Sequence, residues 1–202
     1  MVSSTDNVGN YNAITCPNQN NSYVFISYFN STDDTVEVVA SNNKGSGWTP
    51  PVVVDSSVNT TICGTDIEVH DYNSGPLWIA YTDASTNLGV ALCDSYTLHF
   101  TSWTNSTIDS NVYLSDDIDI AYNSDANDMY IAYGDVDLDY LWLLKSTDGG
   151  QSWLTRQGVD TGGDAGLEPS IAVFNNLVFI THATQIGLNY RLIKSKTAGS
   201  EW

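Results

Sequence analysis

Basic residues are scarce in this sequence. Its 202 residues include six Lys and Arg against 24 Asp and Glu, which gives a formal net charge of −18. A chain with this charge repels phosphate backbones and anionic lipid headgroups, so nucleic acids and membrane surfaces are poor partners for it. The acidic residues are scattered along the chain, and we interpret most of them as a solvated surface.

Cysteine and long apolar runs are also lacking. Cys16, Cys63 and Cys93 form no disulfide framework and no CxxC metal pattern, so either one disulfide with a free thiol or three buried thiols fits. No apolar run is long enough to span a bilayer, and residues 1–7 are too polar for a signal peptide.

The residues that are abundant point to a location outside the cell. A composition rich in Asn, Ser, Thr, Asp and Gly but poor in Lys is typical of a mature secreted or cell-surface protein. Four Asn-x-Ser/Thr sequons agree with this expectation, at Asn20, Asn30, Asn59 and Asn105.

Helical periodicity is absent as well, and short β-forming segments recur in its place. Each of four repeats has a short apolar stretch, a run of β-forming residues and a second apolar run. A less regular segment follows, as expected for an outer edge strand. The repeats cover roughly residues 5–57, 58–110, 111–160 and 161–202, and the β-forming runs are 23–28, 77–81, 129–133 and 177–182.

A turn motif follows the third β-forming segment of the third repeat. Ser146, Asp148, Gly150 and Trp153 have the spacing Ser-x-Asp-x-Gly-x-x-Trp directly after the apolar run 140–144. The carboxylate of Asp148 can accept hydrogen bonds from its own turn, Gly150 can adopt a positive φ, and Trp153 can anchor the loop. The motif resembles the Asp-box (BNR repeat) of sialidase-like β-propeller proteins.

Two further copies of this motif strengthen the resemblance. The first has Asn in place of Asp and comprises Ser41, Asn43, Gly45 and Trp48; the last has Thr in that place and retains Ser195, Gly199 and Trp202. A degenerate copy keeps Trp103. These four tryptophans are 55, 50 and 49 residues apart, a period typical of propeller blades.

The sequence therefore predicts an all-β fold. We expect a single domain, residues 1–202, built as a β-propeller or propeller segment of four four-stranded antiparallel blades, the last lacking most of its outer strand. Either the four blades close into a ring, or the chain is a segment of a longer array of blades. The resemblance favours the longer array, since Asp-box propellers usually have six to eight blades.

The same resemblance does not imply sialidase activity. Sialidases hold the substrate carboxylate with three arginines, whereas this chain has only Arg156 and Arg191, and it lacks the Phe/Tyr-Arg-Ile-Pro signature. We therefore expect the fold without that activity.

Carboxylates at the first strand of each blade are the remaining catalytic candidates. Asp66, Asp117 and Glu168 could converge at one mouth of a propeller channel, where paired carboxylates would suit glycoside hydrolysis. The other interpretation is that they cap the strand starts. Asp135, Asp137 and Asp139 are candidate Ca²⁺ ligands or solvated loop acids, and no other cofactor is expected.

We expect a non-enzymatic extracellular module that presents its loops to a glycan or a protein. The alternatives are a glycoside-hydrolase-like enzyme and a self-assembling cell-surface subunit. The edge at residues 189–194 carries apolar and basic side chains, so we expect it to pair with another strand, from this chain, its continuation or a second copy.

Overall fold

The described part of the chain is entirely β. The computed structural model describes residues 8–17, 22–58, 61, 63–70, 75–96, 100–110, 112–184 and 189–194. Fifteen strands and no helix occur in these residues, which confirms the all-β prediction. Among the same residues there is accordingly no helix that is long and apolar enough to cross a membrane.

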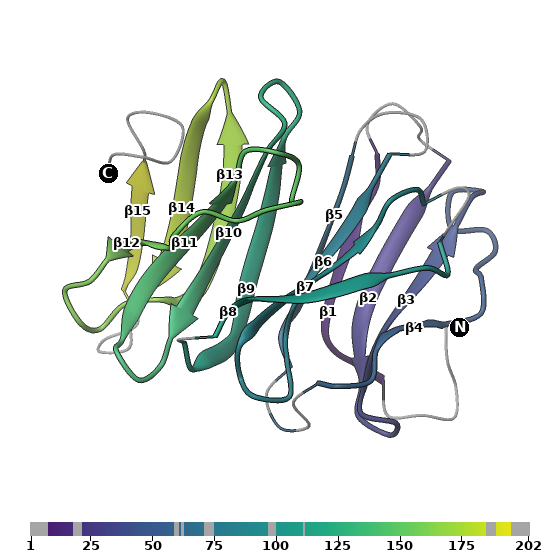
Figure 1. Cartoon of the computed structure of the whole chain (residues 1–202), viewed down its shortest axis with the longest axis horizontal. Coiled ribbons are helices and arrows are strands. Elements are labelled where there is room, and N and C mark those ends of the chain that lie inside the picture. The colour runs from purple at the N-terminus through teal and green to yellow at the C-terminus, as the bar shows by residue number, and fades with distance from the viewer. Residues whose placement is uncertain are drawn as a thin grey trace. The chain divides into compact units, whose positions relative to one another are not determined.

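The chain divides into two compact units, residues 1–110 and 111–202. The division coincides with the boundary predicted between the second and third repeats. Each unit contains two sheets, and each sheet corresponds to one sequence repeat (Figure 1). We call these sheets blades 1 to 4 in chain order.

The first unit consists of two antiparallel meanders. Blade 1 comprises β1 (Val8–Thr15), β2 (Val24–Asn30), β3 (Thr35–Ser41) and β4 (Val52–Asp55). Blade 2 comprises β5 (Thr65–Val69), β6 (Leu77–Thr82), β7 (Leu88–Cys93) and β8 (Thr104–Asp109). In both blades the strands pair in sequence order, as expected for hairpin-connected propeller blades.

The second unit has the same construction. Blade 3 comprises β9 (Leu114–Asn123), β10 (Asp128–Asp135), β11 (Tyr140–Ser146) and β12 (Gln157–Asp160). Blade 4 has three described strands, β13 (Leu167–Phe174), β14 (Leu177–Ala183) and β15 (Tyr190–Lys194). The described residues of blade 4 include no fourth strand.

Apolar side chains hold the two blades of each unit face to face. In the first unit, Val36 and Val38 of blade 1 belong to one buried cluster with Ile67 and Ile79 of blade 2. In the second unit, the corresponding cluster joins blade 3 to blade 4. Its principal members are Leu141, Leu143, Ile171, Val178 and Ile180. Neither blade alone could bury these faces, so the pair of blades is the smallest folding unit.

Hydrogen bonds between inner strands fix how neighbouring blades meet. In the first unit the Thr65 hydroxyl donates to the carbonyl of Tyr11 over 2.7 Å. In the second, the Asp119 carboxylate accepts the N–H of Ile171 over 2.6 Å. Each of these side chains bonds the backbone of a neighbouring blade, which explains why polar residues alternate with the core isoleucines.

Candidate functional site

The turn at residues 146–153 is closed by its own side chains. Ser146 Oγ lies 2.7 Å from Asp148 Oδ1 and accepts the N–H of Gly150 over 2.8 Å. Asp148 also accepts the N–H of Ser152 over 2.9 Å. These hydrogen bonds, first among them those from Ser152, lower the pKa of Asp148 to about 2. The carboxylate is therefore ionised, and held by the turn, across the ordinary pH range.

The turn at residues 41–48 repeats these contacts with an amide. Gly45 N–H donates to Ser41 Oγ over 2.8 Å, and Gly47 N–H donates to Asn43 Oδ1 over 2.7 Å. A Cβ added at Gly45 would lie 3.8 Å from the Trp48 ring, so the tryptophan packs beneath the loop. The third copy, with Ser195, Gly199 and Trp202, lies outside the described residues.

Replacing Asp148 by Ala is expected to cost about 1–2 kcal/mol of unfolding free energy, because two backbone N–H groups lose their acceptor. Asp148→Asn should cost less, since Asn43 already supplies the same acceptor in blade 1. The folded-state pKa is depressed, so the contribution is full above the ordinary pKa of 3.8 and is lost as pH falls towards about 2. Urea unfolding at pH 7 and pH 2.5 would measure both effects. An unchanged stability of Asp148→Ala at pH 7 would contradict a structural role.

An aromatic hollow opens between the two blades of the first unit. It measures about 400 Å³ and lies between the turn of blade 1 and the corresponding β7–β8 connection of blade 2. Among the described residues, its lining combines four aromatic rings with amide and hydroxyl groups and includes no charged side chain. The residues are Tyr23, Ala40, Asn42, Asn43, Gly47, Trp48, Thr49, Tyr96 and Phe100.

Three rings of the aromatic hollow, those of Tyr23, Tyr96 and Phe100, pack against other aromatic rings of the first unit. Tyr96 packs edge-on against Tyr23 and against Phe25, with ring centroids 5.2 Å apart in both pairs. Phe100 lies 6.0 Å from Phe25 and 6.4 Å from Trp103. Preorganised rings beside amide groups can stack on the C–H face of a sugar and hydrogen-bond its hydroxyls.

The predicted catalytic carboxylates are distributed over both units. Asp66 lies on β5 of the first unit, and Asp117 and Glu168 lie on β9 and β13 of the second. Asp117 accepts the backbone N–H of Glu168 over 3.0 Å, and the Glu168 carboxylate accepts the Tyr190 hydroxyl over 3.1 Å. Asp117 and the backbone of Glu168 thus meet, whereas convergence with Asp66 remains a prediction.

The Tyr190–Glu168 pair does not produce a reactive phenolate at neutral pH. The hydrogen bond to Glu168, and then the negative charge of that residue, raise the pKa of Tyr190. The phenol therefore remains protonated and donates to the carboxylate.

The acidic loop after β10 forms a turn. Asp135 is buried and accepts the N–H of Asp137 over 3.1 Å, and the carbonyl of Asp139 accepts the N–H of Ala165. Across the described residues no three His, Cys, Asp or Glu side chains are grouped so that they could hold a metal ion.

Two of the three cysteines are buried and poorly nucleophilic. Burial raises the pKa of Cys63 to about 12 and also raises the pKa of Cys93. Cys16 is exposed, and all three are free thiols.

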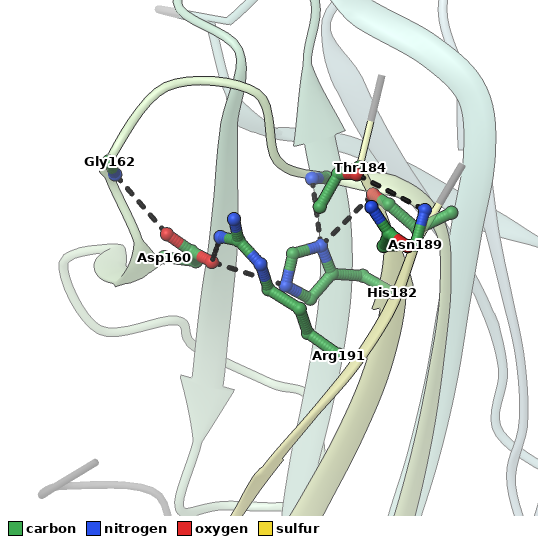
Figure 2. Close-up of polar contacts among 8 residues, drawn as sticks. Asp160, Gly162, His182, Thr184, Asn189 and Arg191 are labelled. Atoms are coloured by element: carbon green, nitrogen blue, oxygen red, sulfur yellow. Dashed lines mark hydrogen bonds and ion pairs between the residues drawn. The ribbon is translucent and has the colours of Figure 1, made fainter. Parts of the chain in front are cut away.

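A buried histidine is the feature that the sequence did not reveal. His182 is completely buried on β14, and its Nε2 lies 3.3 Å from the Asp160 carboxylate of blade 3 (Figure 2). Arg191 donates to the same carboxylate over 2.6 Å. Gly166 N–H donates to His182 Nδ1 over 3.2 Å, and the same nitrogen lies 3.1 Å from the carbonyl oxygen of Ala183.

The contact of His182 with Asp160 is equivalent to a contact between the two blades of the first unit. In the first unit the Tyr81 hydroxyl donates to Asp55, at the end of the preceding outer strand, over 2.6 Å. Tyr81 pairs with Gly89 across the sheet, and His182 pairs with Arg191 at the same register position. A Cβ at Gly89 would lie 2.9 Å from the Tyr81 ring, so in blade 2 the ring lies directly over this glycine.

Tyr28 occupies the same register position in blade 1 but has its acceptor within the blade. Its hydroxyl donates to Glu37 over 2.8 Å, and Asn30 donates to the other oxygen of that carboxylate. Asn30 is only 1% exposed, so this sequon is inaccessible for glycosylation.

No protein-family model matches this chain, and no curated protein matches it. Solved structures do match. A mutant of AofleA from Arthrobotrys oligospora has a TM-score of 0.65 at 11% identity, covering 90% of this chain and 52% of that one. The BP39L lectin from Burkholderia pseudomallei has a TM-score of 0.63 at 9% identity, covering 93% and 53%. The endosialidase of phage phi92 has a TM-score of 0.61 at 14% identity, covering 88% and 31%.

These matches establish the fold of the chain. At such low identities they show a β-propeller similar to those of sialidases and other glycan-active proteins, and nothing finer. The chain spans about half the length of two of these structures and a third of the other.

Proposed function

We propose that this chain is a carbohydrate-recognition module that binds a glycan without cleaving it, and that the aromatic hollow of the first unit is its binding site. The observation that carries the proposal is the lining of this hollow, four aromatic rings beside Asn42, Asn43 and Thr49. Its volume of about 400 Å³ lies within the range of small-molecule sites.

The comparisons support the same class of ligand. A lectin and an endosialidase have the fold of this chain, so glycan recognition is a known use of it. We further propose that the turns at 41–48 and 146–153 are Asp-boxes, because they share one set of hydrogen bonds. A secreted or cell-surface location would suit such a module.

Binding of a glycan library to the purified chain tests the proposal. Trp48→Ala is expected to weaken binding at least about tenfold, because a stacked aromatic typically contributes more than about 1.4 kcal/mol. Trp153→Ala is the matched control, since it removes the equivalent tryptophan of the blade 3 turn, which does not line the hollow. Melting curves would verify that both variants fold. Equal loss of binding in the two variants, or a wild-type chain that binds no glycan, would contradict the proposal.

A glycoside-hydrolase-like activity is the second candidate. It is favoured by the meeting of Asp117 with the backbone of Glu168 and by the hydrogen bond from Tyr190 to Glu168. If this candidate is correct, Glu168→Gln should abolish the release of reducing sugar while leaving Trp48-dependent binding intact. We expect no release of sialic acid, because arginine is too scarce to hold its carboxylate; turnover abolished by Arg191→Ala would show otherwise.

A further inference from the structure

Two positions of each third strand are used to pack one blade on the next. In blade 1, Val36 and Val38 are both fully buried in the cluster shared with blade 2. In blade 3, Leu141 and Leu143 are 0% and 1% exposed in the cluster shared with blade 4. Wherever a following blade of the same unit covers these positions, they are removed from solvent.

The same two positions are exposed in blade 4. Tyr190 pairs with Ala183 as Val36 pairs with Phe29, and Leu192 pairs with Thr181 as Val38 pairs with Ser27. Tyr190 is 73% exposed and Leu192 is 69% exposed. Phe174, on the same face of β13, is 68% exposed. We call this surface the trailing face; large apolar groups at packing positions mark it as a contact surface.

Blade 1 has the complementary exposed face. The packing isoleucine of the first strand pairs with an isoleucine of the second in every blade, at Ile14, Ile67, Ile120 and Ile171. Ile67, Ile120 and Ile171 are 3%, 3% and 8% exposed, whereas Ile14 is 68% exposed. We call the surface around Ile14 the leading face.

We infer that the trailing face of one chain packs against the leading face of a second copy. Within each unit, the surface of one blade that corresponds to the trailing face packs against the surface of the next blade that corresponds to the leading face. The two exposed faces therefore match, in chemistry and in position, the two sides of a contact that the chain already makes. One chain spans 52% and 53% of two matched structures, so two copies supply about their full length.

The contact is heterologous, since a different face is used on each copy. Such contacts either close into a ring or continue as an open series. Two copies with two equivalent contacts leave neither face exposed. Each copy carries a formal charge of −18, so association should strengthen as salt screens the repulsion.

Light scattering coupled to size-exclusion chromatography tests this inference at about 50 μM chain. The wild type is expected to have twice the mass of one chain, and Leu192→Glu the mass of one. Leu154→Glu is the matched control, because Leu154 is also an exposed leucine of the second unit, at 54%, but lies on neither face. It should leave the dimer intact, and raising the salt concentration should increase the dimer fraction of the wild type.

Complementation distinguishes head-to-tail packing from other dimers. Ile14→Glu should also be monomeric, yet an equal mixture of Ile14→Glu and Leu192→Glu should recover the dimer mass, because one intact contact forms between them. Both side chains are exposed in the single chain, so both variants should remain folded and melt cooperatively, at a lower temperature than the wild-type dimer. A monomeric wild type at every concentration, a dimer unaffected by Ile14→Glu, or a mixture that does not associate would overturn the inference.

Discussion

Gly166→Ala is expected to lower the unfolding free energy by about 2–5 kcal/mol. Gly166 has a φ of +89°, and a Cβ there would lie 2.5 Å from the carbonyl oxygen of Tyr140 and 3.0 Å from the Cα of Gly134. Both are backbone atoms that no rotamer change can move. A left-handed conformation costs a non-glycine residue about 1–2 kcal/mol, and overpacking adds about 1–3 kcal/mol.

Gly163→Ala separates these two costs. Gly163 also has a positive φ, of +73°, but nothing lies within 4 Å of a Cβ placed on it. The Gly163→Ala variant should therefore lose only about 1–2 kcal/mol of unfolding free energy, measured by urea unfolding with tryptophan fluorescence as the signal. Equal losses in the two variants would show that the contact with Tyr140 relaxes at no cost.

Asp160→Ala is expected to cost about 2–4 kcal/mol. The carboxylate accepts from Arg191 over 2.6 Å and from Gly162 N–H over 3.2 Å, and it lies 3.3 Å from the buried Nε2 of His182. Removing it leaves Arg191 and Gly162 N–H without this acceptor and also removes the carboxylate contact of the completely buried imidazole. Arg191→Leu should cost less than about 1 kcal/mol, because the Arg191 side chain is 46% exposed and screened by water.

Acidification should diminish the effect of Asp160→Ala. Burial raises the pKa of Asp160, but the hydrogen bonds from Arg191 and Gly162, together with the Arg191 charge, outweigh burial and lower it overall. A depressed folded-state pKa means that the carboxylate stabilises the fold fully above its unfolded pKa of about 3.9, and less as pH falls further. The unfolding free energies of the wild type and of Asp160→Ala should therefore approach each other as the pH falls from 7 to 3. A difference that grows on acidification would assign the stabilisation to another group.

The sequence predicted the blades because their periodicity is local. The β-forming runs became β2, β6, β10 and β14, and the tryptophan turns follow the third strand of blades 1 and 3. Register was harder to predict, because Ile118 and Ile120 lie in one alternating run; Ile120 is the residue that pairs with Ile131 as Ile67 pairs with Ile79. In the alternating run Asp117–Ile120, a shift of two residues keeps the same face, so the pattern cannot distinguish the two.

The candidate sites depend on contacts between blades, which spacing does not encode. The aromatic hollow joins residues more than fifty positions apart, such as Tyr23 and Phe100. The Asp160–His182 contact left a faint signal, since Tyr28, Tyr81 and Tyr133 recur at spacings of 53 and 52 and the next equivalent residue is a histidine. The replacement of tyrosine by His182 marks this position as different, but the contact with Asp160 follows only from the fold.

The two kinds of tyrosine contact determine where this chain can be cut. Tyr28 finds its acceptor, Glu37, within its own blade, whereas Tyr81 depends on Asp55 of the blade before it. A permuted or shortened protein that opens at blade 1 thus keeps its tyrosine hydroxyl bonded. A protein that opens at blade 2 lacks Asp55, and the hydroxyl of Tyr81, a residue that is only 2% exposed, then has lost this acceptor. Blade 1 is therefore a better first blade than blade 2 for a permuted or shortened version of these repeats.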